Sequence, residues 1–212
     1  MRTSLRPWHW AALIPNLGLA AIALNDAVTR ALTGQDSIAA STSGNAVVIA
    51  IAAIIHGLAY LGIVMVLWRE ADAFRTANRF AQVLRRVLMV TFGFMGLAML
   101  LVETWRPQGV DGSEGLAAAW GLVGSAAFMV MLLGSCLLGF ALLRNNPLGI
   151  GGRILLGILP AFGLVVLLGA IGSPWEHPGY IEFVQGVGMS LLGAGATARR
   201  PATTDAVSET VG

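Results

Sequence analysis

The sequence predicts an all-α integral membrane protein, a polytopic bundle of six transmembrane helices with both ends of the chain in the cytoplasm. The composition is the first indication, because the 212 residues are 56% hydrophobic and 11% charged, whereas a soluble domain has roughly 25% charged residues. Apolar runs also recur at about the 20-residue length that a helix needs to cross a bilayer. Finally, arginine is concentrated in alternate connections between these runs. Because the polar connections are too short to form a core, we expect residues 1–196 to form one membrane domain.

Six runs qualify as spans, and they cover residues 8–24, 46–68, 87–102, 116–143, 154–171 and 180–196. The first run also resembles a cleavable signal peptide, since arginines precede it and small residues end it. Pro15 and Asn16 are more typical of a retained span. Pro15 and Pro160 each remove a backbone hydrogen bond, so we expect kinks there. Residues 197–212 are small and polar, and they predict a disordered cytoplasmic tail.

The orientation follows from the segment 69–86, which holds five of the thirteen basic residues, all arginine: Arg69, Arg75, Arg79, Arg85 and Arg86. Short loops rich in arginine stay on the cytoplasmic side of a membrane. With both ends inside, eleven arginines are cytoplasmic and two, Arg30 and Arg106, are on the outer side. The all-arginine, alanine- and glycine-rich usage is typical of a GC-rich bacterial genome. We therefore expect the cytoplasmic (inner) membrane of a bacterium.

The same segment 69–86 predicts a helix at the membrane surface that leads into the third span. An apolar stripe recurs at helical spacing, and most of the arginines lie off it; the stripe is Phe74, Ala77, Ala81, Leu84 and Leu88. The arginines either anchor the topology against anionic lipid headgroups or bind a specific lipid or partner.

Small residues at four-residue intervals mark the predicted helix contacts. In the sixth span these are Gly186, Ser190 and Ala194. Membrane helices approach one another closely through such residues. The stripe indicates tight packing within one bundle, or contact with a second copy of the chain in a homo-oligomer.

His56 is the main candidate for a functional residue inside the membrane. It lies about nine residues into the second span, and therefore near the bilayer midplane, with Tyr60 one turn away on the same face. An ionisable residue at this depth is a functional candidate because burying it is costly. The alternative is a neutral imidazole that hydrogen-bonds Tyr60, Asn16 or a backbone carbonyl and holds helices together.

Acidic residues gather at the predicted outer ends of the spans, where we expect Glu182 just inside the hydrocarbon boundary. They form a site or simply balance the cytoplasmic arginines. The candidate ligand-binding residues or polar path are Asn16, His56, Tyr60, Glu103, Glu182 and Gln185. Weak candidates for metal ligands are Glu176, His177 and Glu182, near which Asp26 also falls.

Missing residues argue against several enzyme classes. A haem between helices usually needs two axial imidazoles, and His56 is the single histidine that we expect inside the bilayer. The chain has no HExxH motif, no lysine for a Schiff base and one cysteine, Cys136. We expect no cofactor, and the net charge of +2 does not indicate a nucleic-acid partner.

The leading interpretation is a non-enzymatic membrane component that binds a lipid, a small hydrophobic molecule or a partner membrane protein. One alternative is a small transporter or channel with a polar path through His56 and Glu182. Convergence of these two residues with Asn16, Tyr60 and Gln185 on one water-accessible cavity would favour transport. A second alternative is a metal-dependent intramembrane hydrolase.

Overall fold

The computed structural model describes residues 5–38, 45–105 and 115–195, with the backbone alone at 105 and 115–120, and these ranges are all-α. The long helices are α1 (Pro7–Thr33), α2 (Ala46–Arg69), α4 (Arg79–Leu101) and α5 (Gly115–Ala141). The shorter elements are α3 (Ala71–Ala77), the 3₁₀ turn η1 (Glu103–Trp105), α6 (Gly149–Ile154), the 3₁₀ turn η2 (Leu155–Gly157), α7 (Ile158–Ala170) and α8 (Gly179–Ser190). The predicted tail 197–212 lies outside the described residues.

Among the described residues, five helical stretches are long and apolar enough to cross a membrane: Pro7–Thr33, Ala46–Arg69, Arg79–Leu101, Gly121–Ala141 and Gly149–Ala170. Many large apolar side chains on their outer surfaces are exposed, among them Val90 at 71% and Leu122 at 73%. Such a surface is unfavourable in water and suits contact with lipid chains. The chain is therefore a possible multi-pass membrane protein.

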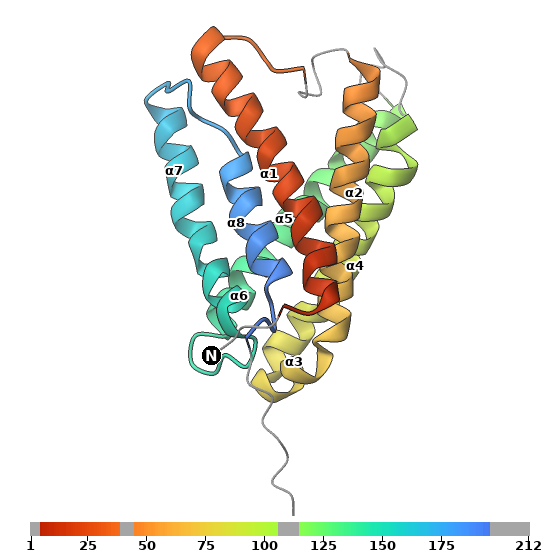
Figure 1. The fold of residues 1–212 in the computed structure, drawn as a ribbon, viewed down its shortest axis with the longest axis vertical. Coiled ribbons are helices and arrows are strands. Elements are labelled where there is room, and N and C mark those ends of the chain that lie inside the picture. Colours follow the sequence, from red (N-terminus) through yellow and green to blue (C-terminus); the bar gives the residue numbers. More distant parts are fainter. Residues whose placement is uncertain (1–4, 39–44, 106–114, 196–212) are drawn as a thin grey trace, which may run out of the picture.

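The helices run alternately up and down (Figure 1). The start of α1, α3, α6 and the end of α8 lie at one end of the bundle, which we call the α3 end (Figure 1). Helix α1 packs between α2 and α8, while α4 packs between α2 and α5. The fully buried side chains at these contacts include Phe92, Leu88, Met131 and Met189.

Asparagine side chains set several helix ends at the α3 end. Asn78 begins α4 by accepting a hydrogen bond from the Ala81 amide at 2.8 Å, and its Nδ2 donates to the Ala141 carbonyl at the end of α5. Both contacts satisfy backbone groups that helix ends leave unpaired. The third long helix therefore begins at Arg79 rather than at the predicted residue 87. Within the predicted segment 69–86, the short helix α3 is separate from α4, since Asn78 is extended at φ −163°. Its location at a membrane surface stays a prediction.

Two further boundaries differ from the prediction. Helix α1 continues past residue 24 to Thr33 and ends at Gly34, where φ is 70°. Hydropathy indicates where lipid contact ends, and a helix can extend beyond that point. Helical structure at Gly149–Ala170 starts before the predicted residue 154 and is interrupted by η2. This interruption directly precedes Pro160, which has no amide to donate to the Leu156 carbonyl.

The sixth predicted span, 180–196, is not a full-length helix. Helix α8 has 12 residues, or about 18 Å at about 1.5 Å per residue, against a hydrocarbon core of about 30 Å. It begins well below the upper ends of α1 and α7 (Figure 1). After Ser190 the backbone turns, with φ of 82° at Gly193 and 71° at Gly195.

The small residues of α8 do make close helix contacts, as predicted. A Cβ atom added at Gly186 would meet the Asn16 side chain, and one added at Gly188 would meet Leu155. These glycines let α8 lie directly against α1 and against the η2 turn. Contact with a second copy of the chain stays a prediction.

Candidate functional site

His56 and Glu182 face each other in the middle of the bundle. His56 lies at the centre of α2, and Glu182 lies in the first turn of α8. The distance from His56 Nε2 to Glu182 Oε2 is 3.8 Å. Glu182 therefore lies beside His56 rather than at an end of the bundle. The expected depth of Glu182 in a bilayer stays a prediction. The connection 171–178 runs from the end of α7 down to the lower starting point of α8 (Figure 1).

Both side chains lack hydrogen bonds to the described part of the chain. His56 Nε2 is buried without a hydrogen-bond partner there, and 3.8 Å is too long for one to Glu182. The Tyr60 ring packs beside the imidazole, with the ring centroids 4.9 Å apart. Buried polar groups are nearly always paired in proteins. The imidazole and the carboxylate are therefore available to a partner such as water, a proton or a solute.

Asn16 and Gln185, in contrast, already have partners. Asn16 Nδ2 donates to the Ala12 carbonyl at 2.8 Å and to Ser190 Oγ at 3.2 Å. Gln185 Nε2 donates to the Met131 carbonyl at 2.9 Å and to Ser135 Oγ at 3.0 Å. Asn16 thus links α1 to α8, and Gln185 links α8 to α5. These two residues of the predicted polar path therefore connect the helices next to His56 and Glu182.

Three cavities meet at His56 and Glu182. The smallest has about 20 Å³, room for about one water molecule, and is lined by all five residues whose convergence was in question: Asn16, His56, Tyr60, Glu182 and Gln185. A second, of about 320 Å³, extends along α1 past Glu103 to Asp26 and His177. A third, of about 520 Å³, lies between α2, α4 and α5 and includes Glu103, Ser125 and Phe128. We call this joined space the central cleft.

The Asp26 end of the cleft is tied together by hydrogen bonds. His177 Nδ1 accepts from the Gly179 amide at 3.0 Å, so the proton is on Nε2, which donates to Asp26 Oδ2 at 3.2 Å. The other Asp26 oxygen accepts from the Ser37 amide at 2.9 Å. These contacts fix the entry to α8 against the upper part of α1.

The weak metal candidates are not brought together. His177 pairs with Asp26, whereas Glu182 faces His56. Within the described ranges, no group of three histidine, cysteine or acidic side chains could hold a metal ion. This arrangement gives no support to the hydrolase interpretation.

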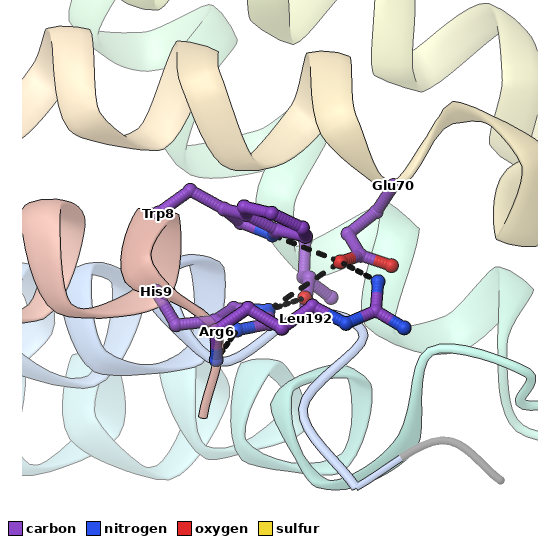
Figure 2. A network of polar contacts seen from close by, with 5 residues as sticks. All are labelled: Arg6, Trp8, His9, Glu70 and Leu192. Atoms are coloured by element: carbon purple, nitrogen blue, oxygen red, sulfur yellow. Dashed lines mark hydrogen bonds and ion pairs between the residues drawn. The ribbon is translucent and has the colours of Figure 1, made fainter. Parts of the chain in front are cut away.

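A polar network closes the bundle at the α3 end (Figure 2). The buried carboxylate of Glu70 accepts from Arg6 NH1 at 3.2 Å and from Trp8 Nε1 at 3.0 Å. The Arg6 amide donates to His9 Nδ1 at 3.1 Å, so Nε2 carries the proton and donates to the Leu192 carbonyl at 2.9 Å. This network joins the start of α1, the end of α2 and the chain after α8.

Sequence reasoning missed Glu70 and His9. Two signals were present: an acidic residue within the arginine-rich segment, and a histidine in the first turn of a span. Each also fits an exposed interfacial position. In the tertiary structure both side chains are instead buried, with 6% of Glu70 and 0% of His9 exposed.

The five arginines predicted to contact anionic lipid have different environments. Arg85 NH1 donates to the Leu67 carbonyl at 3.1 Å, so it helps to end α2. Arg69 stacks on Trp68 at 5.2 Å, and Arg75 forms an exposed ion pair with Asp72 at 2.7 Å. The remaining two, Arg79 and Arg86, are exposed. Lipid contact through these residues stays a prediction.

The sequence matches no protein-family model, and no curated protein or solved structure is significantly similar to it, so the central cleft itself is the guide to function.

Proposed function

We propose that the protein is a small transporter of the cytoplasmic membrane that takes a small solute from the outer side into the central cleft. The observation that carries this proposal is the position of His56 and Glu182. Both line the cavity of about 20 Å³ on which Asn16, Tyr60 and Gln185 also converge, and both line the cavities of about 320 Å³ and 520 Å³ beside it. Scattered side chains would instead favour separate structural roles. His56 and Glu182, which lack hydrogen bonds to described residues, are the groups that contact the solute.

The proposed topology has six crossings, with both ends of the chain inside. The sixth crossing combines the connection 171–178, α8 and the turns that follow. The described arginines at the α3 end support this orientation through the positive-inside rule; they are Arg6, Arg69, Arg75, Arg79, Arg85, Arg86, Arg144 and Arg153. Arg30 lies near the opposite end of α1. The closed α3 end is then cytoplasmic, and the cleft faces outward.

The interrupted sixth crossing also supports transport. Transporters often bind solute near the midplane, where helices are discontinuous. Non-helical backbone at membrane depth is tolerated where it borders a cavity or is buried in protein. The start of α8 meets this condition, since Gly179 lines both the smallest cavity and a separate apolar one against α1.

A second candidate is a component that binds a lipid or small hydrophobic molecule without moving it. The apolar side chains in the 320 Å³ part of the cleft, which include Leu19, Ile22 and Ile49, favour this alternative. Net uptake of a bound solute into vesicles distinguishes the two, because a static binding protein releases its ligand on the side from which it came.

Cysteine labelling tests the outward-facing cleft. In a Cys136→Ser background, Ser125→Cys should react from outside intact cells with a membrane-impermeant thiosulfonate, because Ser125 lines the cleft. Thr76→Cys, exposed at the α3 end, is the matched control and should react after the membrane is permeabilised. The reverse pattern of labelling would contradict the orientation. A Ser125→Cys variant that stays unlabelled in both conditions would contradict a water-accessible cleft.

A further inference from the structure

We infer that the solute is an organic cation, bound with its charge beside Glu182 and its apolar groups against aromatic and methionine side chains of the central cleft. The inference rests on the proposed function, because it names the class of solute for the same cleft.

The charges that line the cleft favour a cation. Glu182 contributes a carboxylate to both larger cavities and Asp26 contributes one to the cavity of about 320 Å³, and no arginine is among the described residues that line them. Asp26 is held by His177 and Ser37. The Glu182 carboxylate lies 3.8 Å from the His56 imidazole. A carboxylate at this depth is costly without a counter-charge, and a bound cation would supply one.

The remaining lining favours an organic cation over an inorganic one. Around the 520 Å³ cavity lie Tyr60, Phe128, Met95, Met99 and Met129. Aromatic faces attract cations and commonly recognise quaternary ammonium groups. Methionine side chains are flexible and adapt to apolar surfaces of different shape. A volume within the range of about 300–1,000 Å³ typical of small-molecule sites leaves room for apolar groups around the charge.

The test compares two ions of the same shape and opposite charge. Purified protein in lipid nanodiscs is dialysed to equilibrium against radiolabelled tetraphenylphosphonium or tetraphenylborate, with empty nanodiscs as the background. The cation should bind saturably, and the anion should bind much more weakly. Glu182→Gln should weaken cation binding at least about tenfold, since it removes the counter-charge. Asp72→Asn, an exposed acidic residue outside the cleft, should leave binding unchanged.

A glycine pair separates this inference from the proposed function. Gly124 lines the cleft and Gly163 lies exposed on α7, and a Cβ at either position would have no neighbour within 4 Å. Gly124→Leu should therefore fill the cleft without disturbing the fold and abolish binding, while Gly163→Leu should bind normally.

Each alternative outcome has a distinct meaning. Equal binding of both ions, lost in Gly124→Leu, would overturn the organic-cation class and leave the solute cleft intact. Cation binding that survives Glu182→Gln unchanged would also overturn the inference. If neither ion shows saturable binding that Gly124→Leu abolishes, the organic cation and the solute cleft are both refuted.

Discussion

Replacing Glu70 by alanine should destabilise the bundle because it removes the acceptor at the centre of the α3-end network (Figure 2). Glu70 is 6% exposed and accepts from Arg6 and Trp8, while His9 Nε2 lies 3.6 Å from the same oxygen. The variant leaves the hydrogen bond from His9 to the Leu192 carbonyl intact. The expected loss is therefore confined to the contacts of the carboxylate itself.

The magnitude follows from the two hydrogen bonds. A hydrogen bond to a charged group contributes about 1.5–3 kcal/mol. The hydrogen bond from Trp8 should contribute an amount within this range, because its acceptor is buried. The hydrogen bond from Arg6 should contribute less than this range, since the Arg6 side chain is 45% exposed and water can replace the carboxylate. Together they give a loss of about 2–4 kcal/mol in the free energy of unfolding.

The assay is titration of the purified protein with SDS, followed by far-UV circular dichroism. Asp72→Ala is the matched control, because Asp72 is 90% exposed and pairs with an Arg75 side chain that is 73% exposed. This control should unfold like the wild type. If Glu70→Ala and Asp72→Ala unfold with the same free energy, the network contributes no stability and the reasoning fails.

Two further pairs of substitutions test the packing and the division between structural and solute-binding residues. Gly193→Ala should lower the free energy of unfolding by about 1–2 kcal/mol from its left-handed backbone alone. The loss should be larger than this, because the added Cβ would collide with the Glu70 carboxylate. Gly172→Ala is the control in the same SDS titration: its φ is 64° and its Cβ would meet open space, so it measures the backbone contribution alone. Asn16→Leu should reduce the folded yield on size-exclusion chromatography, since it removes links to α2 and α8, whereas His56→Leu should fold normally and lose solute binding. Equal loss of folded protein in both variants would contradict this division.

The positions of the five long apolar helices could be predicted from the sequence. Each depends on the composition of one continuous stretch, because a span must bury about 20 apolar residues in lipid. The second span shows this clearly, since the predicted range 46–68 agrees with α2 at Ala46–Arg69. Helix ends were harder to predict, as at Asn78, where a cap and its contact with α5 interrupt an otherwise continuous apolar stripe.

The depth and the partners of the site residues were decided by the tertiary structure. The position of His56 in one span predicts its place near the midplane, but its neighbour Glu182 comes from a helix that begins late and ends early. The hydropathy of residues 180–196 predicts a full span, whereas the helix there has 12 residues.

The all-α class and the long apolar helices could thus be predicted from the sequence, since length and apolar composition are properties of each segment alone. The tertiary structure decided which polar residues are satisfied and which are available. Asn16, Gln185 and Glu70 have found partners, whereas His56 and Glu182 have no hydrogen bond to the described residues. The physical reason is that a hydrogen bond acts over about 3 Å, so its presence depends on contacts between segments far apart in the chain.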